Sequence, residues 1–378
     1  LLAVLAVVLA AQVAVAAPAQ RTVLVFGDSL SAAHGMAARQ GWVALLGERL
    51  GARKPGWKVV NASVSGETTA GGASRIGKEG GRHLIQIDDG TEAPTETGAV
   101  PYEDALAAQS NGAFSFDCTE FPWGSAYYAQ HGVMMPADGL ETLQDFDAIY
   151  FGAVGWENVP DHVSLWGLRL NITQNFDQWA NIRPVRFLPG VVSPLRKADD
   201  TELDWVVVRE NSEGEYAGLG GRNLAGRGPG NEVAVQSSLF TEKGCERIIR
   251  FAFDLARTRT VQKVSSVTKS NAQQYGMVLW DEVFARVAQD YPDVETEKVL
   301  VDAMAAKFVL RPEDLSVVVA TNLHADILSD LGSAMAGSLG LASSANLNPE
   351  RRTPSMFEPV HGSAPDIAGQ GIANPIGA

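Results

Sequence analysis

Apolar and polar positions follow two kinds of pattern along most of the chain. Short β-branched or apolar runs predict strands, and longer runs with helical spacing predict the helices between them. The predicted strands cover residues 22–26, 58–64, 148–154, 205–208, 263–267 and 316–320, and the predicted helices include 245–257 and 277–289. This alternation of strands and helices predicts an α/β fold.

Two segments depart from this alternation. Residues 1–17 form an apolar run that ends in Ala14-Val15-Ala16, which is typical of the hydrophobic region and cleavage site of a secretory signal. The run is shorter than the ~20 residues of a spanning helix, so we expect a cleaved signal and no stable membrane insertion. Residues 77–113 are polar, rich in Gly, Thr, Glu and Pro, and without period, which indicates a linker or degraded segment.

Composition and charge narrow the class of ligand. With 378 residues, 46% of them hydrophobic, the chain is long enough for two or three domains with a sizeable core. The formal charge of −14 argues against nucleic acid as a partner, because such a protein needs a basic face toward the phosphates. A small ligand or a cation is favoured. Cys118 and Cys245 are too few and too far apart for a metal knuckle or a disulfide framework, and we expect two buried thiols.

A first resemblance lies near the N-terminus. The phrases VLVFGDSLSAAHGM and VVNASVSGETTAGG resemble the opening of the SGNH, or GDSL, esterases. The resemblance implies a partial flavodoxin-like β-α-β unit over residues 18–76, with Ser29 as nucleophile and Gly66 as an oxyanion-hole amide. The Asp-x-x-His phrase that supplies the family's base does not occur in the sequence, and His34 stands in a different context. An exported esterase with an incomplete triad is therefore only an alternative.

Three carboxylates further on suit a hard cation. Asp326 and Asp330 are four residues apart, which places both on one face of a helix, and Asp302 precedes them in VDAMAAKFVL. Carboxylate oxygens are the ligands that Mg²⁺ and Mn²⁺ prefer, whereas Zn²⁺ would require His or Cys nearby. A solvated acidic helix face is the plainer interpretation of the pair alone.

A second resemblance covers residues 114–378. Eight phrases occur in the order of the isocitrate, 3-isopropylmalate and tartrate dehydrogenase family. Their residues resemble those of tartrate and D-malate dehydrogenases more than those of leucine-pathway enzymes. They are FDAIYFGAVGW, DHVSLWG, NIRPVRFLPG, VVVRENSEGEY, SSVTKSNAQ, VDAMAAKFVL, ADILSDLG and MFEPVHGSAPDIAGQGIANP. The resemblance implies the two-domain isopropylmalate dehydrogenase fold, in truncated form.

The resemblance also implies roles for individual residues. Arg183 and Arg209 match arginines that clamp the substrate carboxylates, a task suited to the planar guanidinium fork. Tyr216 matches the general acid of decarboxylation, and Lys269 matches the lysine that helps remove the hydroxyl proton. Lys269 and the metal ligand Asp302 would be lent across the two-fold axis of a homodimer.

The resemblance places the dinucleotide on a loop near the C-terminus. No GxGxxG follows a strand, which argues against a Rossmann site. Asp366 would accept the ribose 2′-hydroxyl and repel a 2′-phosphate, so we expect NAD as the cofactor. The other expected cofactor-binding residues are Glu358, His361, Gly362, Ser363, Ala364 and Asn374.

These roles imply metal-dependent oxidation of a 2-hydroxy dicarboxylic acid by NAD, followed by decarboxylation. The sequence departs from the family at Thr173, where an arginine is expected ten residues before Arg183. LIQIDDGTEAPTETG replaces the family's first strand and its glycine-rich turn, and the helices that follow the last Asn-Pro are absent. A 3-isopropylmalate dehydrogenase and an inactive fusion product thus stay open. A working dehydrogenase would be cytoplasmic, whereas the N-terminal segment indicates the periplasm.

Overall fold

The computed structural model describes residues 117–188, 191–195, 203–364 and 367, together with three strands at 21–25, 57–61 and 83–87. The signal-like segment, Ser29, Gly66, Asp366 and Asn374 lie outside the described residues. The expected roles of these residues therefore stay predictions.

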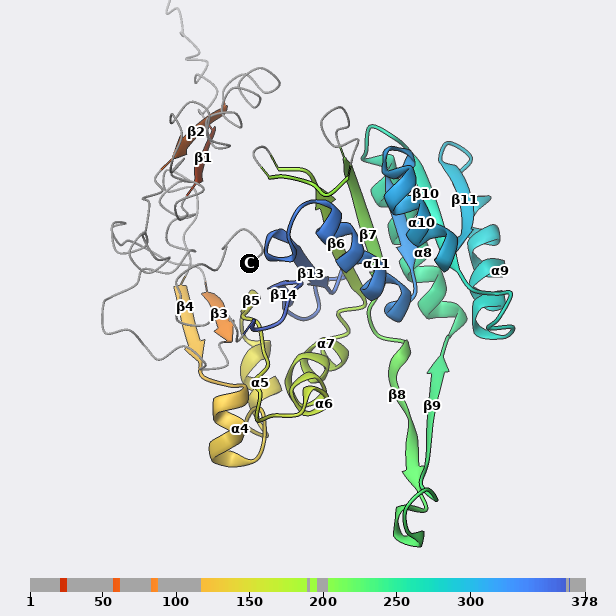
Figure 1. Cartoon of the computed structure of the whole chain (residues 1–378). Coiled ribbons are helices and arrows are strands. Elements are labelled where there is room, and N and C mark those ends of the chain that lie inside the picture. The colour runs from red at the N-terminus through yellow and green to blue at the C-terminus, as the bar shows by residue number, and fades with distance from the viewer. Residues whose placement is uncertain are drawn as a thin grey trace, which may run out of the picture.

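A large mixed sheet forms the centre of the fold (Figure 1), in the order β11-β10-β12-β7-β6-β13-β14-β5-β3-β4. β13 runs antiparallel to β6 and β14, β6 runs antiparallel to β7, and the other neighbouring strands are parallel. The strands are β3 (His83–Ile87), β4 (Asp117–Phe121), β5 (Ala148–Phe151), β6 (Ala180–Arg186), β7 (Asp204–Glu210), β10 (Lys263–Thr268), β11 (Glu295–Leu300), β12 (Val317–Ala320), β13 (Ser343–Leu347) and β14 (Ser355–Pro359).

Helices cover both faces of one half of the sheet. Successive strand residues point to opposite sides, so the strands present apolar side chains to the helices on each face. Val206 and Val317 pack in the cluster formed with α8 (Glu242–Arg257) and α9 (Gly276–Ala288). Trp205 and Val318 pack in the opposite cluster, formed with α10 (Val301–Leu310) and α11 (Asn322–Met335). The strands and helices predicted for this half are confirmed, and so is the α/β class.

A third cluster lies under the other half of the sheet. Ile149 and Phe151 of β5 and Met356 of β14 pack there with Trp123 and Leu143. The helices of this part are α4 (Ser125–His131), α5 (Gly139–Gln144), α6 (Asp161–Ser164), the π-helical turn η2 (Leu165–Arg169) and α7 (Leu170–Asn175). Two short 3-10 turns, η4 (Pro312–Asp314) and η5 (Leu339–Leu341), also lie in the body of the fold.

A two-stranded arm projects from the body (Figure 1). It consists of β8 (Gly214–Asn223), the turn η3 (Ala225–Arg227) and β9 (Val233–Leu239). The glycine-rich stretch of the sequence forms this hairpin, where a Cβ at Gly220 would meet the Val235 carbonyl oxygen at 2.2 Å. Leu219, Val233 and Val235 are exposed on it.

The strands near the N-terminus form two separate structures. β1 (Arg21–Val25) and β2 (Trp57–Asn61) pair in parallel as a sheet of their own, which confirms both predicted strands. β3 instead joins the large sheet between β4 and β5. β3 lies inside residues 77–113, the expected linker or degraded segment, and two neighbouring strands supply the order that its weak pattern did not predict.

Two smaller findings concern Cys118 and membrane insertion. Cys245 is buried as expected, but Cys118 is half buried because β4 is an edge strand of the large sheet. No disulfide joins the two residues.

Among the helices of the described residues, none combines the length and the apolar character that crossing a bilayer requires.

The position of β3 predicts a difference between two proline substitutions. Ile85→Pro removes a backbone N–H from a strand that pairs on both sides, so we expect the melting temperature to fall by on the order of 5 °C. Val59→Pro, in the separate β1–β2 sheet, is the matched control and should leave the main transition unchanged. Differential scanning calorimetry measures both. Equal effects of the two substitutions would contradict this placement of β3.

Candidate functional site

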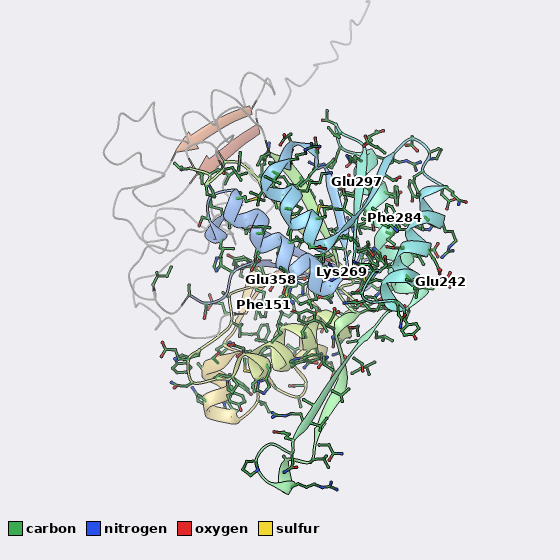
Figure 2. The ribbon with its side chains drawn as sticks, turned by 45° about the vertical axis from the view of Figure 1, so that its right-hand side comes forward. Phe151, Glu242, Lys269, Phe284, Glu297 and Glu358 are labelled. Carbon is green, nitrogen blue, oxygen red and sulfur yellow. The ribbon has the colours of Figure 1, made fainter. Side chains whose placement is uncertain are left out.

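A cavity of about 480 Å³ opens where the two halves of the large sheet meet. Its walls come from five parts of the sequence: residues 151–155 at the end of β5, the helices α6 and η2, strands β6 to β8, α11, and residues 358–362 at the end of β14. Figure 2 shows Phe151 and Glu358, which both line the cavity, side by side at this junction. The size is that of a small-molecule site.

Asp326 of α11 joins three groups on the cavity wall. Its Oδ1 accepts hydrogen bonds from Arg183 Nη1 at 3.0 Å and from Arg209 Nη1, and its Oδ2 accepts one from Tyr216 Oη at 3.0 Å. The three donors come from β6, β7 and β8, so one carboxylate connects one helix with three strands. The structure thus brings four residues predicted for the site into direct contact.

Amide side chains fix the direction of both arginines. Asn322, the first residue of α11, accepts from Nε and Nη2 of Arg209 at 2.9 and 2.7 Å. Asn181, two residues before Arg183 on β6, accepts from its Nε at 2.9 Å. Ser329 Oγ accepts from Arg183 Nη1 at 2.7 Å. Because both guanidinium groups are buried and held, they are preorganised for an anion.

Burial and neighbouring charges shift the pKa values of Asp326, Arg183 and Tyr216. Burial acts to raise the pKa of Asp326, but Arg209, Arg183 and Arg169 hold it well below its usual range, so the carboxylate stays ionised. Burial and then repulsion from Arg209 lower the pKa of Arg183 to about 10. Burial, with the charge of Asp326, raises the pKa of Tyr216, which keeps its proton available. Burial and the neighbouring cation both oppose the charge of Arg183, and an added anion would offset both effects.

Arg169 is a third arginine of the cavity, and the sequence did not identify it as a site residue. It ends η2 and donates from Nε at 2.9 Å and from Nη2 at 2.6 Å to the Glu358 carboxylate. Thr173, where an arginine was expected, is buried in α7 and donates to the Leu170 carbonyl oxygen. The sequence does place an arginine, Arg169, one helical turn before Thr173. The π-helical turn η2, which brings its side chain to the cavity, could not be predicted.

The other predicted metal and proton-transfer residues lie apart from Asp326. Asp330 follows one turn later on α11 and is an exposed residue, although desolvation of its carboxyl group raises its pKa. Lys269 Nζ donates to Asp302 Oδ1 at 2.6 Å, an exposed pair that does not line the cavity. Within the described residues of one chain, three His, Cys, Asp or Glu side chains nowhere gather closely enough to hold a metal ion.

The donor set fits a hard divalent cation only in part. Asp326 and Asp330 offer oxygen ligands one helical turn apart, and the ionised state of Asp326 suits cation binding. A cation near both would also offset the desolvation that raises the Asp330 pKa. One chain supplies two of the three expected carboxylates, so the third would have to come from a second copy.

The loop after β14 supplies the residues expected to bind the dinucleotide. His361 and Gly362 line the cavity, and a Cβ on Gly362 would meet no atom within 4 Å. His361 Nδ1 donates to the Gly362 carbonyl oxygen at 2.7 Å, and Ser363 Oγ donates to the Gly155 carbonyl oxygen at 2.7 Å. Ala364 has a positive φ of 46°. The described part of this loop thus borders the cavity and is tied to residues after β5, whereas Glu358 is buried and already pairs with Arg169.

Family comparisons agree with this geometry. Residues 103–378 match the family model described as isocitrate/isopropylmalate dehydrogenase, and residues 23–100 match that of GDSL-like lipases and acylhydrolases. The fold is similar to a crystal structure of isocitrate dehydrogenase from Methylococcus capsulatus. The TM-score is 0.65 at 31% identity, and the match covers 78% of this chain and 82% of that one.

Several curated proteins are more similar in sequence. A probable tartrate dehydrogenase/decarboxylase of Agrobacterium vitis is 60% identical over 268 residues, which cover 71% of this chain and 74% of that protein. The decarboxylating D-malate dehydrogenase of Escherichia coli is 52% identical over 272 residues, 71% of this chain and 75% of that protein. The chain therefore belongs to the isocitrate/isopropylmalate dehydrogenase family of enzymes.

Proposed function

We propose that this enzyme oxidises and decarboxylates a small 2-hydroxy dicarboxylic acid of the tartrate or D-malate type, with NAD and Mg²⁺ or Mn²⁺. The observation that supports this most is the contact of Arg183, Arg209 and Tyr216 with one carboxylate, that of Asp326. The cavity lining contains three arginines, Arg169, Arg183 and Arg209, and three carboxylates, Asp161, Asp326 and Glu358. A divalent cation and a dicarboxylate would enter this lining together without changing its formal charge.

The names of the relatives support the choice of substrate. Those with 52% to 60% identity are called tartrate or D-malate dehydrogenases, including the tartrate dehydrogenase/decarboxylase of Pseudomonas putida at 52% over 276 residues, 72% of this chain and 74% of that protein. Three arginines and three carboxylates stand among the apolar residues of the cavity wall, and an apolar branch on the substrate next to the arginines would be buried against these charged groups. This disfavours 3-isopropylmalate as the substrate.

The side chains have distinct tasks in this proposal. Arg183 and Arg209 bind a substrate carboxylate and hold it beside Asp326. A bound divalent cation would polarise the oxygen at C2, and the nicotinamide of NAD would accept the hydride from C2. Lys269 takes the proton of the C2 hydroxyl. After CO₂ has left, Tyr216 donates its proton to C3, and its raised pKa favours the protonated state this step needs.

A homodimer completes the site in this proposal. Lys269 and Asp302 lie as a pair outside the cavity of their own chain, where their charges have no part in the site. Tyr216 belongs to β8, the strand that continues into the exposed arm. Docking of the arm on a second copy would cover Leu219, Val233 and Val235 and bring each pair to the other copy's cavity.

The substrate class is tested by NAD reduction with D-malate, tartrate and 3-isopropylmalate in turn. We expect turnover with one of the first two in the presence of Mn²⁺, and its loss when a chelator is added, because the C2 oxygen needs the cation. Absorbance at the NADH band measures the rate. Turnover that survives chelation would refute metal dependence, and turnover confined to 3-isopropylmalate would refute the substrate class.

The carboxylate clamp predicts that Arg209→Lys reduces kcat/KM by about tenfold to a hundredfold, because lysine keeps the charge but not the planar fork. Steady-state kinetics with D-malate measure the change. Arg257→Lys is the matched control, since Arg257 pairs with Asp293 on the surface. A kcat/KM for Arg209→Lys equal to that of the control would contradict the clamp.

Sharing of the site predicts complementation between inactive variants. Lys269→Ala and Asp326→Asn damage groups that different subunits give to one site, so a hybrid dimer has one intact site. Equal mixing after unfolding and refolding should restore about a quarter of the wild-type activity. Lys269→Ala mixed with Asp302→Asn is the control, because both groups come from the same subunit and no intact site can form. Restoration in the control, or none in the test, would contradict the shared site.

A further inference from the structure

We propose that Arg169 binds a carboxylate of the substrate directly, as a third arginine beside Arg183 and Arg209. The inference rests on the proposed function and defines which groups hold the second acid group of the ligand. Arg169 lies on the cavity wall, in a π-helical turn that the sequence did not predict.

The π-helical turn gives Arg169 its position. Between α6 and α7 the helix widens over Leu165–Arg169, an arrangement that is rare and frequent at functional sites. Leu165 and Arg169 both line the cavity, whereas Leu168 and Leu170 on either side of Arg169 are buried in the interior. The turn therefore places the charged side chain on the cavity while its neighbours stay packed.

The guanidinium is only partly used by the protein. Nε donates to both Glu358 oxygens at 2.9 Å, and Nη2 donates to Glu358 Oε1 at 2.6 Å and to Asn346 Oδ1 at 3.4 Å. Within the described part of the chain, Nη1 donates to no protein group. A guanidinium has five N–H donors, so the group on the cavity wall keeps donors for a ligand oxygen.

A buried network holds Arg169 in place. Asn346 donates to Glu358 at 2.7 Å and accepts at 2.7 Å from Asn181, which in turn accepts from Arg183. The side chain of Glu358 is only 6% exposed and that of Arg169 14%. Two cavity arginines are thus linked through fixed amide and carboxylate groups. Little side-chain freedom remains to be lost when a ligand binds, which favours affinity.

The charge of Arg169 is also suited to a ligand. Glu358 neutralises it in the free protein, so the buried cation is stable without substrate. Asp326 already pairs with Arg183 and Arg209. A dicarboxylate therefore meets three arginines whose charges are each partly neutralised by a carboxylate of the protein. Thr173, on the same helix and buried, offers no such charge. The second acid group of the ligand therefore has Arg169 as its available cationic partner in the described cavity wall.

Binding of D-malate in the presence of Mn²⁺ and without dinucleotide tests the assignment, measured by titration calorimetry on the full chain. We expect Arg169→Gln to weaken binding by about tenfold to a hundredfold, the effect of one charge-assisted hydrogen bond or a pair of them. Arg186→Gln is the matched control, an exposed arginine on β6 that does not line the cavity. It should bind D-malate as the wild type does.

Two further variants separate ligand binding from a structural role. Arg169→Lys keeps the cation next to Glu358, and we expect it to fold and to bind D-malate with intermediate affinity. Arg169→Gln combined with Glu358→Gln leaves no buried carboxylate without its cation, and we expect binding to stay weak. Restored binding in this double variant, or wild-type affinity in Arg169→Gln, would overturn the assignment. Absence of D-malate binding by the wild type would instead overturn the proposed function.

Discussion

The meeting of three donors at the Asp326 carboxylate is the interaction on which the site depends. Arg183, Arg209 and Tyr216 come from three strands, and all three donate hydrogen bonds to one residue of α11. A buried cation without a partner is costly, so the arginines require Asp326 as much as it requires them. The same carboxylate is the expected metal ligand. Binding of a cation and a substrate would exchange these internal contacts for contacts with ligands.

The arm and the N-terminal strands show how distant segments reach this centre. Tyr216 lies at the base of the β8–β9 arm, and its hydroxyl donates to Asp326 of α11, which ties the start of the arm to the body of the fold. β3 lies within residues 23–100, which match GDSL-like lipases, yet it pairs with β5 of the dehydrogenase sheet. The β5 strand leads into the cavity wall at Phe151. A strand that precedes the segment matching the dehydrogenase family thus pairs with the strand that leads into the site.

Much of the fold and part of the site could be predicted from the sequence, because the periodic patterns of strands and helices are local properties of the chain. The α/β class, the strands at 205–208, 263–267 and 316–320, and the shared helix of Asp326 and Asp330 follow from such patterns. Arg169 could not be placed, because a π-helical turn leaves no clear local pattern and its partner Glu358 is 189 residues away. β3 was missed because its order comes from two neighbouring strands.

Binding of Mn²⁺ in the presence of D-malate tests the central role of Asp326 most directly. Electron paramagnetic resonance distinguishes free from bound Mn²⁺ and needs no turnover. The account predicts one tightly bound Mn²⁺ per subunit in the wild type and its loss in Asp326→Asn, while Asp314→Asn, on the η4 turn, binds as the wild type does. Equal binding of Mn²⁺ by the wild type and Asp326→Asn would contradict it.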